Sequence, residues 1–491
     1  MDQYVIAIDQ GTTSCRTLIF DERGNIFAQS QKEFTQIYPH PGWVEHNAEE
    51  ILNTQLTTLH HALSKVKNIT QIKSIGITNQ RETTVLWDKS TGKPVCNAIV
   101  WQDRRTAPVC EDLKKKGLEN YIKKTTGLVP DAYFSATKIK WILEHEPTAF
   151  EVLQQGNLLF GTIDTWLLWH LTAGRVHATD YTNASRTMLF NIASLQWDDK
   201  MLDELQIPKS ILPKVQPSLS YFGDVYIQSH TIPVMGIAGD QQAALFGHGC
   251  SHEGEAKNTY GTGCFMLMNT GDKQIVSQKG LLATIICSTQ RKPQYALEGS
   301  VFIAGAAIQW LRDGLKILDD ASQSASMATA VPDNGGVYMV PAFAGLGTPY
   351  WDMYARGAIF GITRDTTHHH IVRAALESIA YQTCDVIQTM TDEAGIQLAA
   401  LKVDGGATHN HFLMQWQADM LDCDILIPRM RETTAWGAAL LAGTAVGVYE
   451  EDNKLNSIQS KYSPQMSAEK RKLILKKWSN AVQRSMNWEN I

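Results

Sequence analysis

Short apolar runs alternate along the chain with segments whose apolar residues recur at helical spacing. The runs are rich in Ile and Val and end at polar or glycine-rich turns, which is typical of buried strands. They comprise Val5–Asp9, Ile72–Thr78, Ile232–Ala238 and Leu401–Asp404. Helices are predicted over Ile371–Thr391 and Thr434–Val446, the second of them dense in Ala and Leu. This alternation predicts an α/β fold.

One strand–turn–strand pattern occurs in both halves of the chain. Its first copy spans Val5–Phe20 and turns at Gln10–Ser14, and its second copy spans Ala256–Met268 and turns at Gly261–Gly263. Two similar turns that lie half the chain apart predict two related halves that face one another. The glycine-rich, polar stretch Gly247–Gly254 is the expected boundary between them.

The C-terminal segment Ser467–Trp488 has the pattern of a basic amphipathic helix. We expect a surface helix that Trp478 and Trp488 dock onto the rest of the protein.

The composition is that of a folded protein with several domains. The chain has 491 residues, of which 44% are hydrophobic and 19% charged. A chain of this length is expected to hold roughly two to four domains. Lys and Arg total 44 against 50 Asp and Glu, and no stretch concentrates basic residues. This balance excludes nucleic acid as an expected partner.

Nothing in the sequence predicts export or insertion into a membrane. The N-terminus leads directly into the first strand, without a basic region followed by a long apolar region. No window approaches the roughly 18 apolar residues of a membrane span. The eight cysteines include no C-x-x-C pair, which argues against a zinc site or a disulfide framework and favours a reducing cytoplasm.

Two turns are candidates for binding phosphate. The sequence lacks the G-x-x-x-x-G-K-[ST] motif, a complete G-x-G-x-x-G and the protein-kinase motifs. Asp9–Ser14 nevertheless offers successive backbone N–H groups and hydroxyls, with Arg16 close behind. Asp9, at the end of a strand, is placed to hold Mg²⁺ through water. A polar hairpin turn is the alternative, but Gly261–Gly263 would supply the same donors from the opposite half.

Two glycine-containing segments are candidates for the remainder of a nucleotide. Asp404–Asn410 places two glycines after a strand, where a backbone can approach a flat ligand closely. Ala304–Trp310 places Gly305 on a helix of small residues. An ordinary strand-to-helix turn and close helix packing are the alternative interpretations.

Charged residues also follow two predicted strands. Arg81 and Glu82 follow the strand Ile72–Thr78 after two residues, and such a pair suits a polyol because hydroxyls both donate and accept. Asp240 comes directly after Ile232–Ala238 and precedes a helix. A surface ion pair is the alternative for Arg81 and Glu82. Asp240 is either a helix N-cap or a base that accepts a hydroxyl proton.

Two longer patterns carry a resemblance to a known family. Tyr133–His145 matches the first signature of the FGGY carbohydrate kinases, and Gly357–Ile362, His370-Ile371 and Ala374–Glu377 match the second. From Tyr4 to about Trp488 the chain therefore resembles this family, which belongs to the actin-like ATPase superfamily. The resemblance implies two actin-like (ribonuclease H-like) domains, with a mixed sheet flanked by helices and an interdomain active-site cleft.

Four blocks resemble the glycerol-specific branch of the family rather than its xylulose or gluconate branches. These blocks are Pro41–His46, Ile77–Thr83, Asp180–Met188 and Gly239–Ala243. The resemblance implies an N-terminal domain, residues 1–248, that binds glycerol and phosphate, and a C-terminal domain, residues 249–491, that binds the nucleotide. The implied reaction is Mg²⁺-dependent phosphorylation of glycerol by ATP to sn-glycerol 3-phosphate, the first step of glycerol catabolism. A cytoplasmic homo-oligomer, dimer or tetramer, is implied as well.

The resemblance also assigns roles to individual positions. The residues that would hold the glycerol hydroxyls are Arg81, Glu82, Tyr133, Asp240 and Gln241, with Trp101 and Phe265 against the carbon edge. Asp240 would be the catalytic base, and Asp9 would bind magnesium. The residues that would contact the ATP phosphates are Thr12, Thr13, Ser14, Arg16 and Thr262. Those that would surround the adenosine are Gly305, Gln309, Gly406 and Asn410.

Two other functions remain as alternatives. Another sugar or polyol kinase of the family would have a larger pocket, and an actin-like assembly or chaperone ATPase would need no polyol-binding residues. A metal site at His368–His370 is rejected, because consecutive residues entering a helix point in different directions.

One segment departs from the family pattern. Some members carry a glycine-rich, arginine-bearing loop before the strand that leads to the catalytic aspartate, and fructose 1,6-bisphosphate inhibits them there. The corresponding segment here, Tyr226–Pro233, is shorter and has neither glycine nor arginine. We therefore expect no inhibition by this sugar. His230 is not assigned to the phosphorylated histidine of other members.

Overall fold

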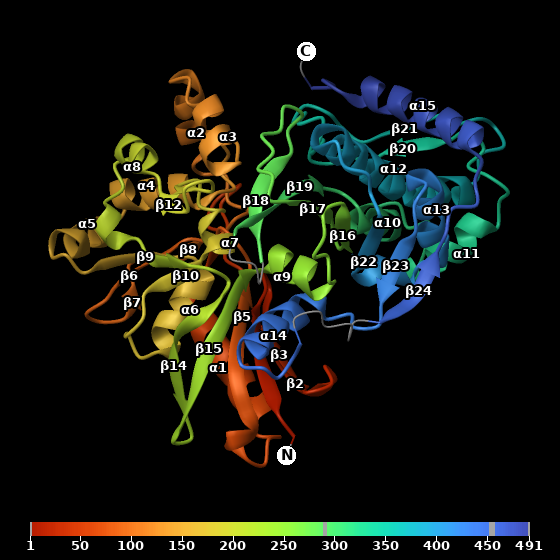
Figure 1. The fold of residues 1–491 in the computed structure, drawn as a ribbon. Coiled ribbons are helices and arrows are strands. Elements are labelled where there is room, and N and C mark those ends of the chain that lie inside the picture. Colours follow the sequence, from red (N-terminus) through yellow and green to blue (C-terminus); the bar gives the residue numbers. More distant parts are fainter. Residues whose placement is uncertain (1, 288–291, 451–456, 490–491) are drawn as a thin grey trace.

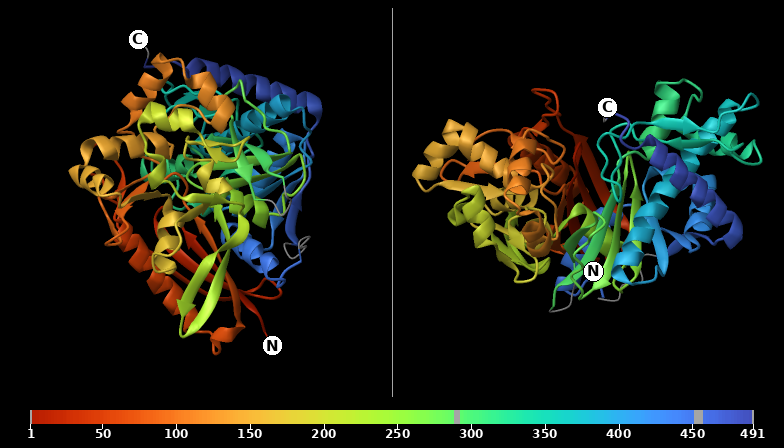
Figure 2. Two further views of the ribbon diagram at one scale, coloured as in Figure 1. Left: turned by 60° about the vertical axis from the view of Figure 1, so that its left-hand side comes forward. Right: turned by 90° about the horizontal axis from the view of Figure 1, so that it is seen from above.

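The chain folds into two lobes, each built on a mixed β-sheet (Figure 1). The structure is a computed structural model and describes residues 2–287, 292–450 and 457–489. Figure 2 shows that the N-terminal half of the chain forms one lobe and most of the C-terminal half forms the other. We call them the N-terminal and C-terminal lobes, after the sheet that each contains. The predicted α/β fold is confirmed.

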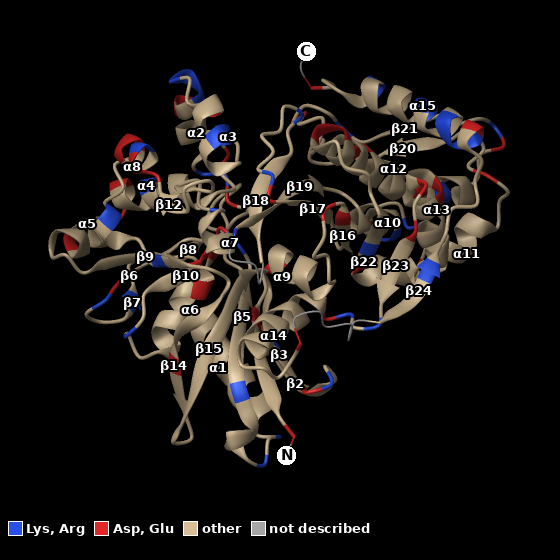
Figure 3. Ribbon diagram, viewed as in Figure 1, with Lys and Arg blue, Asp and Glu red and all other residues tan. Residues whose placement is uncertain are grey.

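Helices cover the sheets, and charges of both signs are interspersed along the outer helices (Figure 3). The α-helices of the described residues are α1 (Ala48–Leu63), α2 (Ala107–Lys115), α3 (Glu119–Thr126), α4 (Ser135–His145), α5 (Pro147–Gln154), α6 (Ile163–Leu171), α7 (Tyr181–Ala184), α8 (Asp199–Leu205), α9 (Asp240–Gly247), α10 (Gly305–Asp313), α11 (Ser324–Thr329), α12 (His368–Ala394), α13 (His411–Leu421), α14 (Thr433–Ala445) and α15 (Ala468–Ser485). Among the residues that the structure describes, no helix has the length and apolarity to cross a membrane.

The sheet of the N-terminal lobe has the strand order β14-β15-β5-β1-β2-β3. Its strands are β1 (Tyr4–Gln10), β2 (Ser14–Asp21), β3 (Ile26–Glu33), β5 (Ile72–Asn79), β14 (Leu219–Ile227) and β15 (His230–Gly239). Every residue of β1 is buried, because its side chains alternate between two layers. Ile6 and Ile8 belong to the cluster that includes α1, whereas Val5 and Ala7 pack with α14. This explains the uninterrupted apolar run in the sequence.

The sheet of the C-terminal lobe has the strand order β18-β19-β17-β16-β22-β23-β24. Its strands are β16 (Glu255–Tyr260), β17 (Cys264–Gly271), β18 (Leu282–Ile286), β19 (Gln294–Val301), β22 (Ala400–Asp404), β23 (Ile425–Pro428) and β24 (Ile458–Tyr462). β16 pairs antiparallel with β17 and parallel with β22, as β1 does with β2 and β5. The predicted repetition of the strand–turn–strand unit is therefore present.

Short strands form smaller sheets around the two large ones. They are β4 (Glu45–His46), β6 (Val85–Asp88), β7 (Lys93–Pro94), β8 (Ala98–Ile99), β9 (Leu158–Gly161), β10 (Ala178–Asp180), β11 (Phe190–Asn191), β12 (Gln196–Trp197), β13 (Lys214–Gln216), β20 (Tyr338–Val340) and β21 (Ala358–Phe360). β7, β6 and β9 form one sheet, and the others pair two by two.

Two sequence-based expectations need refinement. The segment Tyr226–Pro233 is a β-hairpin rather than a loop, because β14 and β15 pair on either side of a turn at Gln228 and Ser229. Both turn residues have positive φ, which suits a two-residue hairpin turn. Trp478 docks α15 as expected, but docking by Trp488 is wrong: this side chain lies beyond the helix and is 65% exposed.

The histidine triplet lies in the first turn of α12, which begins at His368. The ring of His370 accepts a hydrogen bond from the backbone N–H of Thr367, the residue before the helix, at 3.1 Å. The described residues contain no group of His, Cys, Asp or Glu that could enclose a metal ion. His370 thus contributes to a capping box.

Helix α14 crosses from the C-terminal half of the sequence to the sheet of the N-terminal lobe, where glycines permit close approach. A β-carbon at Gly76 of β5 would lie 2.0 Å from the carbonyl oxygen of Ala438 in α14. The division of the chain at residues 248 and 249 stays a prediction, and α14 is a segment that packs across it.

Gly76→Ala should therefore lower the free energy of unfolding by roughly 1–3 kcal/mol, because the methyl group overpacks a rigid backbone contact. Urea unfolding measures the change. Gly406→Ala is the matched control, since a β-carbon there meets no atom within 4 Å and the glycine has no positive φ. Equal midpoints for the two variants would contradict the close packing of α14.

Candidate active site

A cavity of about 600 Å³ lies between the lobes, and residues of both line it. Thr12 and Thr13, in the turn between β1 and β2, contribute from the N-terminal lobe. Gly261, Thr262 and Gly263, in the turn between β16 and β17, contribute from the C-terminal lobe. The two turns predicted to face one another therefore border the same cavity.

Backbone hydrogen bonds hold both turns tightly. Gly11 N–H donates to the carbonyl of Ser14 at 2.9 Å, and Gly261 N–H donates to that of Gly263 at 2.8 Å. Ser14 itself belongs to β2, and its hydroxyl accepts from Gln31 at 3.1 Å. The indole N–H of Trp101 donates to the hydroxyl of Thr12 at 3.1 Å, which joins this turn to the aromatic wall described below.

Helix α10 begins against the second turn. Gly305 N–H donates to the carbonyl of Gly261 at 3.1 Å, and a β-carbon at Gly305 would lie 2.6 Å from that oxygen. Any larger residue at position 305 would push the helix away from the turn. Gln309, one turn further along the helix, is exposed.

Asp9 and Arg16 form an ion pair beside the first turn. Asp9 is buried at the end of β1, and the Arg16 guanidinium contacts both its carboxylate and that of Glu432. Burial raises the pKa of Asp9, the Arg16 charge opposes this, and the charges of Glu432 and Asp240 add to it. Arg16 and Glu432 line a smaller cavity of about 220 Å³ rather than the main one.

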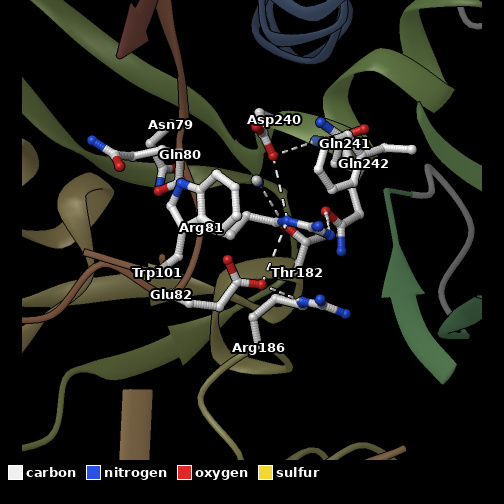
Figure 4. Close-up of polar contacts among 12 residues, drawn as sticks. Asn79, Gln80, Arg81, Glu82, Trp101, Thr182, Arg186, Asp240, Gln241 and Gln242 are labelled. Carbon is white, nitrogen blue, oxygen red and sulfur yellow. Dashed lines mark hydrogen bonds and ion pairs between the residues drawn. The ribbon is translucent and has the colours of Figure 1, made fainter. Parts of the chain in front are cut away.

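Arg81 and Glu82 follow the end of β5 after one intervening residue, and both are buried, with exposed fractions of 2% and 1%. Figure 4 shows their side chains together with that of Asp240. The alternative of a surface ion pair is therefore wrong. Glu82 has a φ of 61°, a left-handed conformation that is uncommon for residues other than glycine. Its carboxylate accepts from Nε of Arg186 at 2.7 Å. Burial raises the pKa of Glu82, while the charges of Arg81 and Arg186 oppose the rise.

Asp240 is the first residue of α9, and Gly239 occupies the N-cap position. The N-cap alternative for Asp240 is therefore wrong. One oxygen of its carboxylate lies 3.3 Å from Nε of Arg81 and accepts from the backbone N–H of Gln241 at 2.7 Å. The side chain is one third exposed, so it remains accessible to a small molecule while facing the buried pair (Figure 4).

Two charged residues of this cluster were not identified from the sequence. Arg186 follows α7 and is completely buried, and Glu298 lies on β19 of the C-terminal lobe. Glu298 accepts two hydrogen bonds from Arg81 and one from Arg186. The sequence does distinguish Glu298, because an acidic residue in the middle of the buried strand Gln294–Val301 is unusual and indicates a partner.

Aromatic rings form the apolar wall of the cavity. The ring of Trp101 lies 5.5 Å from that of Tyr133 and 6.4 Å from that of Phe265, both measured between centroids. All three line the cavity. The ammonium group of the buried Lys138 donates to the carbonyls of Tyr133 and two neighbouring residues, which fixes this segment at the start of α4.

Gln241 on α9 and Lys257 on β16 form a second side-chain contact between the lobes. The Lys257 ammonium on β16 contacts the side-chain oxygen of Gln241 and donates to the carbonyl of Phe265 at 3.2 Å. Burial lowers the pKa of Lys257, while the charges of Asp404 and Asp240 oppose the change. This lysine was also missed, since nothing in its local sequence distinguishes it.

The two remaining predicted residues lie in the C-terminal lobe, away from the polar cluster. Gly406 lines a cavity of about 290 Å³ together with Asp404 and Arg431. Asn410 is the N-cap of α13, and its amide donates to the hydroxyl of Ser324 at 3.1 Å. The double glycine thus borders an open space, as expected for a backbone that approaches a flat ligand.

Comparisons with known proteins agree with this architecture. Residues 4–247 match the N-terminal domain of the FGGY family of carbohydrate kinases, and residues 256–446 match its C-terminal domain. The chain is 57% identical to the glycerol kinase of Alkaliphilus oremlandii, over 100% of this chain and 98% of that protein. It is 56% identical to glycerol kinase 2 of Thermotoga maritima, over 99% of each. The crystal structure of Plasmodium falciparum glycerol kinase with ADP is similar, with a TM-score of 0.94, 38% identity and coverage of 99% of this chain and 98% of that one.

Proposed function

Because this chain belongs to the FGGY family of carbohydrate kinases, we propose that it transfers a phosphoryl group from ATP to glycerol and so forms sn-glycerol 3-phosphate. The observation that supports this most strongly is the cluster of Arg81, Glu82 and Asp240, which contacts Glu298 and Gln241 in the wall of the cavity that the two turns border. An actin-like ATPase without a polyol substrate has no need for such a cluster.

Asp240 accepts the proton of the glycerol hydroxyl that attacks ATP. Its carboxylate is one third exposed, and the next residue, Gln241, lines the main cavity, so a substrate hydroxyl can reach this base. Arg81 donates to one glycerol oxygen and Glu82 accepts from another hydroxyl. Tyr133 and Gln241 complete the polar contacts, and Trp101 and Phe265 cover the carbon edge. Together these contacts orient the attacking oxygen toward the phosphate.

The nucleotide spans the space between the lobes. Backbone N–H groups and hydroxyls of the turns at Thr12, Thr13 and Thr262 bind its phosphates, with Ser14 and Arg16 behind the first turn. Gly305, Gln309, Gly406 and Asn410 surround its adenosine. Contact between the lobes excludes water, which keeps hydrolysis of ATP from competing with transfer.

Asp9 fits the requirements of a magnesium ligand. Mg²⁺ usually binds through one or two carboxylates, water and substrate phosphates, and the Asp9 carboxylate lies beside the first phosphate-binding turn, close enough to Asp240 for their charges to interact. When bound, the ion neutralises charge on the phosphates. Arg16 contacts the Asp9 carboxylate, and Glu432 contacts Arg16 in turn.

The test is ADP release from ATP in the presence of glycerol, dihydroxyacetone, xylulose or gluconate. We expect the highest kcat/KM with glycerol. Release that favours xylulose or gluconate would assign the chain to another sugar kinase activity, and ADP release that no polyol stimulates would contradict the proposal.

We place the protein in the cytoplasm as a homo-oligomer. All eight cysteines are free, which supports a reducing compartment. The association of copies rests on the family resemblance, and light scattering after size-exclusion chromatography tests it. Elution at 54.7 kDa, the mass of one chain, at all concentrations would contradict it.

Fructose 1,6-bisphosphate should leave the activity unchanged at millimolar concentration. A bisphosphate site needs several cationic donors, and the hairpin segment Tyr226–Pro233 has no arginine or lysine. Arg175 reaches this hairpin, but its guanidinium already donates to the carbonyls of Thr172 and Asp224. A titration of glycerol phosphorylation with the sugar, repeated at several enzyme concentrations, measures the effect. Saturable inhibition would show that another surface supplies the donors.

A further inference from the structure

Glu298 is a buried acidic residue of the C-terminal lobe that contacts the cluster of Arg81, Glu82 and Asp240 in the N-terminal lobe. It lies on β19, is 2% exposed and lines the main cavity. The adjacent residues of the strand, Leu297 and Gly299, have no polar side chain that could pair with its carboxylate. A buried carboxylate requires compensation by charge and hydrogen bonds, so its partners reveal what it does.

Those partners are two arginines of the other lobe. Glu298 accepts from Nη1 and Nη2 of Arg81 at 2.7 and 2.8 Å, which is a bidentate contact. It also accepts from Nη2 of Arg186 at 3.0 Å. Burial alone would raise the pKa of Glu298, but the charges of Arg186 and Arg81 outweigh it and lower the pKa to about 2. Glu298 is therefore ionised and spans the two lobes.

The bidentate contact determines which edge of Arg81 faces the substrate. Nη1 also donates to the side chain of Gln242 at 3.2 Å, so both terminal nitrogens are bound by partners other than Asp240. The remaining Nε lies 3.3 Å from Asp240 and 3.7 Å from Glu82. Arg81 thus presents a single donor position, between the proposed base and the second hydroxyl ligand.

Loss of the Glu298 charge would change this orientation. The guanidinium of Arg81 would then have two other carboxylates within reach, Asp240 and Glu82. A bidentate contact with Asp240 would bring that carboxylate's lone pairs into hydrogen bonds and make them less available for a substrate proton. Both glycerol binding and proton transfer would suffer, although Glu298 itself need not touch glycerol.

We propose that Glu298 is a positioning residue for the polyol: from the C-terminal lobe it holds Arg81 with Nε toward Asp240, and it thereby makes the glycerol site dependent on contact between the lobes. The inference rests on the proposed function, since it assigns a role within that site. It differs from a purely structural role, which would change stability but not the kinetic parameters of one substrate.

The principal test is Glu298→Gln, which keeps the shape of the side chain and removes its charge. We expect the KM for glycerol to rise about tenfold or more and kcat to fall, with the KM for ATP changed less than about twofold. Glu377→Gln is the matched control. Glu377 is also a buried acid of the C-terminal lobe, paired with Arg373, but it does not line the main cavity. Its substitution should leave both KM values unchanged.

A second variant and a double-mutant cycle complete the test. Glu298→Asp keeps the charge but withdraws the carboxylate from Arg81, so it too should raise the KM for glycerol selectively, and it substitutes for Glu298→Gln if that variant does not fold. In an Arg81→Lys background, Glu298→Gln should add less than about a twofold further increase, because its effect acts through Arg81. Full additivity would overturn the proposal.

The outcomes separate this inference from the proposed function. Absence of glycerol-dependent ADP release by the wild-type protein would contradict the function itself. An active wild-type protein whose folded Glu298 variants keep the wild-type KM for glycerol would overturn the role of Glu298 alone. Equal increases in the KM for glycerol and ATP would assign Glu298 to general contact between the lobes and would also overturn the role.

Discussion

Asp240→Asn should lower kcat for glycerol phosphorylation by roughly 10²–10⁴ and leave ATP binding nearly unchanged. The amide has the shape of the carboxylate but cannot accept the hydroxyl proton. It also keeps an oxygen that can accept from Gln241 N–H, as the carboxylate does at 2.7 Å. The loss should therefore fall on the chemical step rather than on the fold. Steady-state kinetics with glycerol, together with calorimetric titration with ATP, measures both parts.

The control for Asp240→Asn is Asp199→Asn. Asp199 is likewise the first residue of a helix, α8, and its carboxylate accepts a hydrogen bond from the ammonium group of Lys209. Asp199→Asn also removes a negative charge from a helix N-terminus. The interaction of such a charge with the helix dipole stabilises the fold by roughly 0.3–1 kcal/mol. The kcat of this variant should match the wild type. Retention of more than about a tenth of wild-type kcat by Asp240→Asn would show that Asp240 is not the base.

The strands that carry the proposed site are predictable from the sequence because their signals are local. β1 is a short apolar run that ends at a polar turn, and β16 repeats this strand–turn–strand pattern with a more polar strand; in each case the turn borders the main cavity. The same logic predicts Arg81 and Asp240, which are charged residues that follow the ends of buried strands. Such positions lie at the carboxyl end of a strand, where ligand sites in open α/β sheets occur.

The missing part of the site consists of contacts between distant segments. Glu298 and Arg186 are far from Arg81 in the sequence, and only the packing of the two lobes brings their side chains together. The packing of α14 is unpredictable for the same reason: its Ala-rich pattern predicts a helix but not the lobe on which the helix packs. The hairpin at Gln228 and Ser229 is also unpredictable, because neither turn residue is the glycine or asparagine that usually indicates such a turn.

Arg81→Ala should raise the KM for glycerol about 10–100-fold and change the KM for ATP little. Removal of a charged donor from a buried hydroxyl costs roughly 1.5–3 kcal/mol, and only the polyol is proposed to contact this side chain. The variant should also be less stable by roughly 3–5 kcal/mol, because it leaves Glu298 buried with one guanidinium in place of two. Kinetics and urea unfolding measure the two effects separately.

Arg105→Ala separates binding from stability in this prediction. Arg105 is another buried arginine, paired with Asp103 and Glu45, and it does not line the main cavity. Its substitution should destabilise the protein comparably while leaving the KM for glycerol unchanged. An Arg81→Ala variant with a normal KM for glycerol and a raised KM for ATP would move Arg81 to the nucleotide side and contradict the assignment of the polyol site.

The stability difference between the wild type and Arg81→Ala should also depend on pH. Burial opposes ionisation of Glu298, yet the charges of Arg186 and Arg81 lower its pKa from 4.5 to about 2. A carboxyl group whose pKa is lower in the folded state stabilises the protein above its unfolded pKa, and this stabilisation is lost as the pH falls toward the folded value. Without Arg81 the pKa of Glu298 is higher, so less stability remains to be lost. The gap in unfolding free energy should therefore narrow as the pH falls from about 5 toward 2, and a gap that stays constant over this interval would show that Arg81 does not stabilise the ionised form of Glu298.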